Sequence, residues 1–303
     1  MKLNAERRIS PDGRASAADQ SSSGASAYER SVLGFRADPR LRAFVAKNFL
    51  QEDLAAAVSA YSRSEEFSAI CRVLGPYLSS PARLLDLGAG RGLTSVALSA
   101  KGVRVTTLES DPSEVVGLGA LARYAKARRV PLQLVRGDIL RLPVADGRFD
   151  VAFCRSVLHH LADLGQGLRE IYRVLRPGGL FIAANEHIIS VFSRGKEFLQ
   201  AHPAVAYGVD ERAYPAYAYW WALRRAGFRR VRFFGHPLDF SEFQEATRGN
   251  PVRSCLVRLP LVGGGLARVL HAVHVATRAF LIVPERGLPA TSIVSEKLCP
   301  QGN

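Results

Sequence analysis

The chain has 303 residues, of which 48% are hydrophobic and 22% charged, a composition typical of a globular protein with one large or two small domains. Its four cysteines are scattered and none forms a C-x-x-C pair, so neither a zinc site nor a disulfide framework is indicated. The formal net charge of +14 comes from dispersed arginines, without the basic block typical of a nucleic-acid-binding tail.

The amino-terminal residues are rich in serine, alanine, glycine and aspartate, and we expect residues 1–30 to form a disordered tail. This tail has no apolar segment like that of a secretory signal. No stretch of the chain reaches about 18 uninterrupted apolar residues, the length that a membrane-spanning helix requires. The sequence therefore predicts a cytoplasmic protein.

Residues 31–80 have the spacing of helices. Phe67, Ile70, Leu74 and Leu78 recur three and four positions apart, which places them on one face of a helix. We expect this segment to be a helical extension that forms a lid over a ligand site.

From residue 81 to residue 188, short apolar strands alternate with helices. We expect strands at residues 83–87, 103–108, 131–135, 149–154 and 180–184, and helices at 93–100, 113–128 and 164–175. This alternation is typical of a parallel sheet with right-handed crossovers, so the sequence predicts an α/β fold with helices on both faces.

The pattern is looser over residues 189–303, which we expect to form the acceptor side of the site and the last strands. Here the sequence predicts a helix at 215–226, a strand at 228–234 and a weaker strand at 291–298. A helical insert precedes the last strand: residues 251–283 are apolar and basic, with a helix expected over 266–281. This insert could pack on the domain, form a dimer contact, cover an apolar acceptor or lie on an anionic membrane.

The first strand of the 81–188 segment ends in LLDLGAGRG, residues 84–92, where three glycines alternate. Glycine permits positive φ and lets a ligand approach the main chain closely. The ligand crevice of an open α/β sheet lies at the carboxyl ends of its strands. Glu109 ends the next strand, where an acid can accept hydrogen bonds from ribose hydroxyls. The pattern therefore predicts a nucleoside site.

Asp86 separates two kinds of nucleoside ligand. A carboxylate inside the end of the first strand, beside the glycine turn, would repel a pyrophosphate, and the glycine spacing is G-x-G-x-G instead of the G-x-G-x-x-G of dinucleotide sites. A ligand with an ammonium and a sulfonium group would be attracted to it. S-adenosylmethionine carries both groups together with a ribose, so we expect it to be the cofactor. A nicotinamide-dependent oxidoreductase is the disfavoured alternative.

Four segments resemble the class I S-adenosylmethionine-dependent methyltransferases, and most closely the branch that acts on small molecules, lipids and sugars. They are LLDLGAGRG, TLESD, RGDILRLPVADGRFDVAFCRSVLHHL and EIYRVLRPGGLFIAANE. The resemblance spans residues 81–186 and is looser over 228–298. It implies a Rossmann-like, seven-stranded, mostly parallel sheet with an antiparallel closing strand, and an S-adenosylmethionine-binding core at 81–188.

The resemblance also implies cofactor contacts at matching positions. The methionine half would lie against the turn and the end of the fourth strand, the ribose against the acid that ends the second strand, and the adenine against the end of the third. These positions are Asp86, Gly88, Ala89, Gly90 and Gly92; Arg155 and Ser156; Glu109; and Asp138 and Ile139. The residues alone agree on Asp138, because an acid that follows a strand at this edge can accept a hydrogen bond from an exocyclic amine; a helix N-cap is the alternative.

Methyl transfer to a heteroatom needs positioning, and a general base where the acceptor is a hydroxyl. We expect that base among His187, Glu186 and His160, which follow the fourth and fifth strands; packed or turn residues are the alternative. Residues 201–221 would shape the acceptor pocket. Its candidate hydrogen-bonding side chains are Tyr207, Asp210, Glu211 and Tyr214, with a helix cap and aromatic packing as the alternative.

No histidine or acid cluster has the spacing of metal ligands, so we expect no metal. The Asn-Pro-Pro-Tyr motif of nucleic-acid amino methyltransferases is replaced by CRSV, which argues against nucleic acid as substrate. We expect a methyltransferase acting on an O- or N-nucleophile of a small molecule, sugar or lipid-linked precursor, with peripheral membrane contact through 251–283. A catalytically silent binding protein or membrane-surface partner subunit with the same fold is the alternative.

Overall fold

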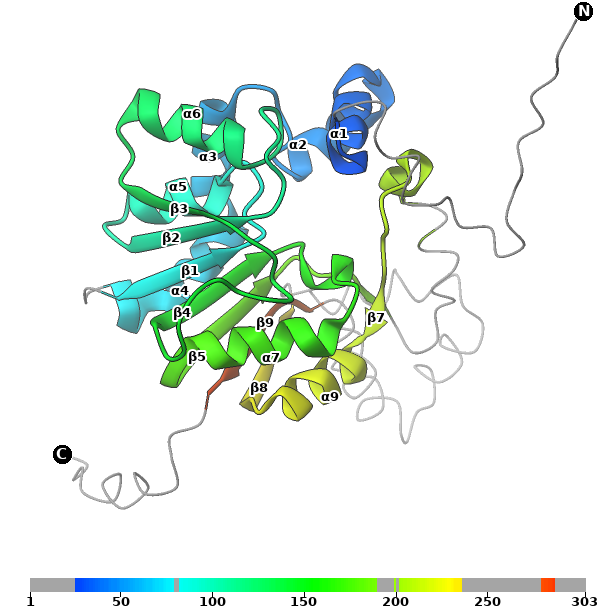
Figure 1. The fold of residues 1–303 in the computed structure, drawn as a ribbon. Helices are drawn as coiled ribbons and strands as arrows, with labels where there is room; N and C mark the ends of the chain where they lie inside the picture. The colour runs from blue at the N-terminus through cyan, green and yellow to red at the C-terminus, as the bar shows by residue number, and fades with distance from the viewer. Residues whose placement is uncertain (1–24, 79–81, 190–198, 200–201, 236–278, 287–303) are drawn as a thin grey trace, which may run out of the picture.

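The computed structural model describes residues 25–78, 82–189, 199, 202–235 and 279–286 (Figure 1). Its main sheet has the strand order β3-β2-β1-β4-β5-β9-β8. The first five strands in the chain are parallel, and β9 pairs in antiparallel fashion with both β5 and β8. The strands are β1 (Arg83–Leu87), β2 (Arg104–Glu109), β3 (Leu132–Arg136), β4 (Phe149–Arg155), β5 (Leu175–Ala184), β8 (Arg229–Gly235) and β9 (Ala279–Glu285). The predicted α/β class and mostly parallel sheet are confirmed.

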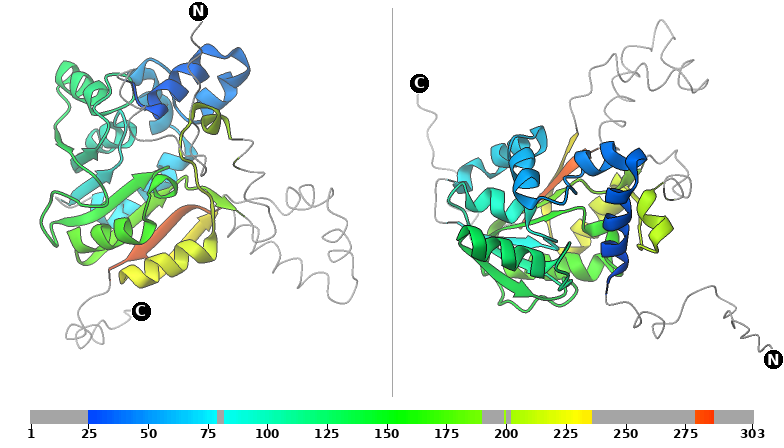
Figure 2. Two further views of the ribbon diagram at one scale, coloured as in Figure 1. Left: turned by 45° about the vertical axis from the view of Figure 1, so that its right-hand side comes forward. Right: turned by 90° about the horizontal axis from the view of Figure 1, so that it is seen from above.

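Alternating side chains of the strands fill two cores, one on each face of the sheet. In β1, Leu85 and Leu87 belong to the core beneath α7 (Leu164–Val174) and α9 (Ala216–Ala226). Leu84 belongs to the core beneath α4 (Glu65–Leu78) and α5 (Leu93–Ser99). Figure 2 shows these helices on opposite faces. The helices that follow β1, β2, β4 and β7 are α5 (Leu93–Ser99), α6 (Leu118–Arg128), α7 (Leu164–Val174) and α9 (Ala216–Ala226). Helices on both faces are thus as predicted.

The amino-terminal extension is helical, but it begins earlier and is more divided than the sequence predicted. It comprises α1 (Ala27–Ala37), η2 (Pro39–Leu41), α2 (Arg42–Lys47), α3 (Leu54–Ser62) and α4 (Glu65–Leu78). Helix α1 begins inside the predicted tail, because Ser26 caps it by accepting a hydrogen bond from the backbone of Glu29. The Ser-x-x-Glu spacing of residues 26–29 is a capping-box pattern. Tyr61, Phe67 and Leu74 place α3 and α4 in the core, not in a lid.

Three short elements join β5 to α9 by way of the second, two-stranded sheet: β6 (Ile188–Ile189), η4 (Pro203–Tyr207) and β7 (Tyr214–Pro215). The insert expected at 251–283 lies outside the described residues up to residue 278, as does the strand expected at 291–298. Residues 279–281, predicted to end a helix, begin β9 instead. A short continuous apolar run such as this one has no periodicity that separates a strand from a helix.

Gly92 has a structural role that the glycine motif alone did not indicate. It caps the amino terminus of α5 with a φ of 79°, and a Cβ atom there would lie 2.3 Å from Leu121 Cδ1. Gly102 has a similar φ of 83°, but a Cβ atom there would meet nothing within 4 Å. A comparison of Gly92 and Gly102 therefore distinguishes the cost of the backbone conformation from the cost of the steric clash.

We expect Gly102→Ala to lower the free energy of unfolding by about 1 kcal/mol, the cost of a left-handed conformation in a residue with a Cβ atom. Gly92→Ala should lower it by a further 1–3 kcal/mol or so, because Leu121 must move in a packed core. Urea unfolding of both variants measures the difference. Equal losses would show that Leu121 accommodates the added methyl group without strain.

Candidate active site

A cavity of about 680 Å³ lies at the carboxyl edge of the sheet, within the size range of small-molecule sites. One side of the cavity is formed by the glycine turn and the ends of β2 and β4. Residues 26–50 and 202–211 form the opposite side. Figures 1 and 2 show α1 and η4 side by side above this edge. Of the ten predicted cofactor residues, the cavity is lined by Asp86, Gly88, Ala89, Gly90, Glu109, Asp138, Ile139, Arg155 and Ser156; Gly92 does not line it.

Glu109 both lines the cavity and holds the glycine turn in shape. Its Oε2 accepts a hydrogen bond from the backbone N–H of Gly90 at 2.6 Å. Its Oε1 accepts from the backbone N–H groups of Ser110 and Asp111, each at 2.8 Å. The carboxylate is thereby fixed at the ligand-facing edge, and its remaining lone pairs can accept from a ribose diol.

Asp86 is buried beside the turn. Its Oδ2 accepts a hydrogen bond from Ser95 Oγ at 2.6 Å, and Thr107 Oγ1 donates to that same hydroxyl at 2.8 Å. Burial raises the pKa of Asp86 from 3.8 to about 7, opposed by the Ser95 hydrogen bond and supported by the negative charge of Glu109. A ligand cation would stabilise the ionised form, so this carboxyl group suits the ammonium and sulfonium of the expected cofactor.

Between about pH 7 and about pH 6 the α-ammonium group of S-adenosylhomocysteine stays protonated. Over this range we expect the affinity of the protein for S-adenosylhomocysteine to fall by up to about tenfold. Below its raised pKa, Asp86 is protonated in the free protein, and binding must release that proton. Calorimetric titration across this range measures the slope. Asp86→Asn should bind weakly with a flat profile; a wild-type profile that is equally flat would contradict the assignment.

The same raised pKa affects stability with a definite sign. Between about pH 4 and about pH 7 the folded protein retains a proton on Asp86 that the unfolded chain has lost. The contribution of this group therefore favours the folded state at low pH and is lost as the pH rises through 7. A bound cation reverses this trend by favouring the ionised carboxylate.

Asp138 and Ile139, the pair predicted to contact adenine, follow β3 and line the cavity. Asp138 Oδ1 accepts a hydrogen bond from the backbone N–H of Leu140 at 2.9 Å, which leaves Oδ2 for a ligand. Ile139 is buried and lies against Gly88. Asp138 does not cap a helix among the described residues, so the N-cap alternative is not what the structure shows.

The end of β4 combines a buried ion pair with an unusual backbone. Arg155 pairs with Glu66 on α4, its Nε lying 2.6 Å from Oε1. The next residue, Ser156, has a φ of 55°, and Asn185 after β5 has the same value. The Asn185 amide donates to Ser156 Oγ at 2.7 Å, which joins the two strand ends. Left-handed conformations in non-glycine residues are often found at binding sites.

Residues 25–50, which we call the lid segment, cover the cavity with mainly apolar side chains. The cavity-lining side chains of this segment include Tyr28, Val32, Phe35, Phe44 and Phe49. Ser26 Oγ donates to Asp111 Oδ2 at 2.7 Å. The guanidinium of Arg91 donates to the carbonyl oxygens of Phe49 at 2.8 Å and Glu52 at 3.1 Å. The sequence indicated a lid, but it did not indicate the hydrogen bonds of Ser26 and Arg91 that hold this segment against the rest of the protein.

At the other end of the cavity, four histidines surround Glu211. Its Oε2 lies 3.4 Å from His187 Nδ1, 3.6 Å from His159 Nε2 and 4.0 Å from His160 Nδ1. Its Oε1 lies 3.5 Å from His202 Nδ1. We call these five residues the histidine cluster. The predicted site residues include His160, His187 and Glu211 of this cluster, but not His159 or His202.

The electrostatics of the histidine cluster keep two of its imidazoles neutral at pH 7. Burial and the neighbouring His159 lower the pKa of His187 to about 3 and that of His160 to about 4. Burial raises the pKa of Glu211, against the opposing influence of His159. His160 Nδ1 lies 3.1 Å from the carbonyl oxygen of Asp210, and since a carbonyl only accepts, Nδ1 carries the proton and Nε2 is the basic nitrogen.

Glu186, a predicted catalytic base, lies beneath this cluster and does not line the cavity. Its Oε1 accepts from the backbone N–H groups of Val157 at 3.0 Å and Leu158 at 3.1 Å, and its Oε2 contacts His159 Nδ1 at 2.7 Å. Burial alone would raise the pKa of Glu186, but His159 and the backbone N–H groups bring it below its ordinary value. Its carboxylate orients the 157–160 segment and is buried outside the cavity lining, so its role as a base stays a prediction that this position does not favour.

The predicted acceptor residues divide equally. Asp210 and Glu211 line the cavity, while Tyr207 and Tyr214 do not. Tyr207 packs edge-on against Phe35 at 5.5 Å, and Tyr214 packs edge-on against Tyr219 at 5.5 Å. Aromatic packing, the alternative considered for this segment, is therefore the arrangement found for both tyrosines.

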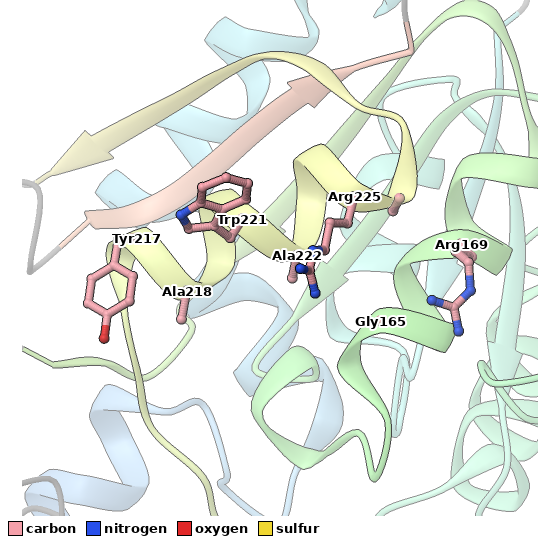
Figure 3. A pocket seen from close by; sticks show the side chains of 8 residues that line it. Gly165, Arg169, Tyr217, Ala218, Trp221, Ala222 and Arg225 are labelled. Atoms are coloured by element: carbon pink, nitrogen blue, oxygen red, sulfur yellow. The ribbon is translucent and has the colours of Figure 1, made fainter.

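A second hollow lies between α7 and α9, far from the glycine turn in the fold. Figure 3 shows Tyr217 and Trp221 on α9 with Arg169 on α7 at this hollow. It shares no lining residue with the larger cavity and contains none of the predicted site residues. Of these two hollows, only the larger cavity is lined by residues that the sequence predicted for the site.

Comparison with known proteins agrees with this geometry. A family model described as a methyltransferase domain matches residues 85–183. A demethylmenaquinone methyltransferase of Mycolicibacterium gilvum is 34% identical over 171 residues, covering 52% of this chain and 69% of that protein. A malonyl-[acyl-carrier protein] O-methyltransferase of Serratia marcescens is 35% identical over 112 residues, covering 37% and 41%. A demethylmenaquinone methyltransferase of Deinococcus radiodurans is 38% identical over 104 residues, of which this chain spans 42% of the length.

Solved structures show the same fold. Phosphoethanolamine N-methyltransferase 2 of Haemonchus contortus has a TM-score of 0.51 at 16% identity, covering 80% of this chain and 61% of that one. Geranyl diphosphate C-methyltransferase of Streptomyces coelicolor A3(2) has a TM-score of 0.50 at 15% identity, covering 73% and 80%. With its glycine turn, its acids and its sequence relatives, the chain belongs to the class I S-adenosylmethionine-dependent methyltransferases.

Proposed function

We propose that the protein transfers a methyl group from S-adenosylmethionine to an oxygen or nitrogen nucleophile of a small molecule, sugar or lipid-linked precursor. The observation that carries this proposal is one cavity with two chemically different ends. Asp86, Glu109 and Asp138 stand at the cofactor end, and the histidine cluster stands at the other. Such a cavity can hold a donor and an acceptor in contact, and orientation alone supplies much of the rate of an in-line transfer.

In the proposed reaction the acceptor atom attacks the methyl carbon, and the electron pair of the carbon–sulfur bond passes to sulfur. The products are the methylated acceptor and the neutral thioether S-adenosylhomocysteine. Where the acceptor is a hydroxyl, its proton must leave. His160 is our proposed receiver of that proton, because Asp210 fixes its tautomer with Nε2 free of a proton; His187 is the second candidate.

The lid segment indicates what kind of acceptor fits. Val32, Phe35, Phe44 and Phe49 give this wall of the cavity an apolar surface, which favours an acceptor with an apolar body and a polar reactive group. Three names among the relatives are consistent with such acceptors: demethylmenaquinone methyltransferase, ubiquinone biosynthesis O-methyltransferase and malonyl-[acyl-carrier protein] O-methyltransferase. No helix among the described residues is long and apolar enough to span a bilayer.

Two measurements test the proposed function. Calorimetry with S-adenosylhomocysteine tests the cofactor end, and lack of binding by folded protein would refute the proposal. Incubation with methyl-labelled S-adenosylmethionine and separate quinone, lipid, glycan and small-metabolite fractions then identifies the acceptor by transfer of label. Binding without transfer to any fraction would instead support a silent binding protein or a partner subunit.

Peripheral membrane contact is a separate proposal with its own test. Binding of vesicles that requires residues 251–283 would support peripheral membrane contact.

A further inference from the structure

The histidine cluster has the composition and arrangement of a transition-metal site. His159, His187 and Glu211 each offer one ligand atom, and these three atoms all lie within 4.8 Å of one another. They come from η3 (Leu158–His160), the turn after β5 and the loop before β7, so no sequence spacing announces them. The lack of a metal-ligand spacing in the sequence therefore does not exclude a site that only the fold assembles.

Two of the three separations between donor atoms are close to those of a tetrahedral site. Two ligands at about 2.05 Å from a zinc ion, at the tetrahedral angle, are about 3.3 Å apart. Glu211 Oε2 lies 3.4 Å from His187 Nδ1 and 3.6 Å from His159 Nε2. His202 Nδ1 lies 3.5 Å from the other carboxylate oxygen, close enough to complete or support the set.

The outer contacts also fit a metal ligand. Glu186 Oε2 contacts His159 Nδ1 at 2.7 Å, which directs Nε2 of the same ring toward Glu211. A carboxylate that fixes the tautomer of a ligating histidine in this way is a regular feature of metal sites. The side chains of Glu186, His159 and Glu211 are 1%, 1% and 4% exposed, so the arrangement is built into the protein and is not a chance surface cluster. Glu211 Oε2 accepts no hydrogen bond in the described part of the chain.

We propose that His159, His187 and Glu211 bind a divalent transition-metal ion of the Zn²⁺ type, with His202 as a fourth or supporting ligand. Imidazole nitrogens with a single carboxylate favour such ions over Mg²⁺, which prefers oxygen ligands. All four residues line the cavity, so the ion would face the acceptor.

The role of this ion rests on the proposed function. An acceptor hydroxyl bound to the ion would have a lowered pKa and would give up its proton to His160 or to water. Its oxygen would then attack the methyl carbon, and the carbon–sulfur electron pair would pass to sulfur. The ion is neither oxidised nor reduced.

The stacking of two histidine rings in the histidine cluster must change when a metal ion binds. The rings of His159 and His187 are stacked, with centroids 3.8 Å apart and an interplanar angle of 15°. A metal lies near the plane of each imidazole that it binds, so two parallel stacked rings cannot share one ion. We expect the ring of His187 to turn out of the stack, and a zinc-bound crystal structure would show this movement.

Metal binding is tested directly on full-length protein without a histidine tag. We expect about one equivalent of Zn²⁺ per chain by calorimetry and by elemental analysis after dialysis, and a Co²⁺ derivative with the intense visible bands of a four-coordinate site. Glu211→Gln and His187→Asn should each weaken Zn²⁺ binding more than about 100-fold, since loss of an outer partner alone costs 10–100-fold. Mg²⁺ should not compete.

Glu114→Gln is the matched control, because it makes the same change from carboxylate to amide at a residue that does not line the cavity. Glu114 is 68% exposed and pairs with Arg123. This variant should bind Zn²⁺ within about threefold of wild type. Circular dichroism and S-adenosylhomocysteine titration of each variant show whether it is folded with an intact cofactor end.

Two outcomes would overturn the metal site. One is wild-type protein that binds S-adenosylhomocysteine but no Zn²⁺, a result that leaves the proposed function standing. The other is Glu211→Gln binding Zn²⁺ as tightly as wild type, which would place the ion elsewhere. Failure of S-adenosylhomocysteine binding with Zn²⁺ binding retained would instead sink the proposed function alone.

Discussion

Replacing Glu109 with alanine should weaken the binding of S-adenosylhomocysteine by about 100-fold. Two hydrogen bonds from ribose hydroxyls to a carboxylate contribute about 1.5–3 kcal/mol each, and about 1.4 kcal/mol corresponds to a factor of ten in affinity. The loss has a second cause in this protein. Glu109 also accepts from the backbone N–H groups of Gly90, Ser110 and Asp111, so the turn itself loses its support.

Glu114→Ala provides the matched control for this experiment, since Glu114 follows the same strand but is exposed and pairs with Arg123. Its affinity should equal that of wild type by calorimetry. Thermal unfolding monitored by circular dichroism shows whether Glu109→Ala is folded at the temperature of the titration. Wild-type affinity in folded Glu109→Ala would mean that the nucleoside does not lie against this acid.

Replacing Glu66 with alanine should lower the free energy of unfolding by about 3–5 kcal/mol, because it leaves the charge of Arg155 without its partner in a largely buried place. Both side chains of this pair are 15% exposed. The guanidinium also lies over the rings of Phe49 at 5.6 Å and Tyr61 at 5.7 Å, so a movement toward bulk solvent would break these contacts. Urea unfolding measures the loss.

Two further variants interpret this loss. Glu65→Ala, one position earlier on the exposed side of α4, should change stability by less than about 0.5 kcal/mol. The double variant Glu66→Leu with Arg155→Met should recover much of the loss, because an apolar pair of similar volume leaves no buried charge. A Glu66→Ala variant as stable as wild type would show that Arg155 is solvated where it stands.

The cofactor end of the site could be predicted from sequence because its signals are local. Asp86, Gly88 and Gly90 are fixed by one strand and its turn, and Glu109 ends the strand that pairs directly beside it. In a parallel sheet, the carboxyl ends of neighbouring strands necessarily share one edge. Strand alternation and acid position were therefore sufficient, without knowledge of any long-range contact.

The acceptor end could not be predicted in the same way. His159, His187, His202 and Glu211 come from four separate segments, and only the folded chain brings their donor atoms within a few ångströms. Tyr207 and Tyr214 show the converse difficulty. Phenol rings serve packing and hydrogen bonding equally well, so residue type alone did not reveal that both pack away from the cavity.

Arg91 joins two parts of the molecule that the chain keeps far apart. Its backbone lies between Gly90 and Gly92 in the turn, while its guanidinium holds the carbonyl groups of Phe49 and Glu52. A ligand bound against the turn would therefore lie next to a residue whose side chain is also hydrogen-bonded to the segment at residues 49–52.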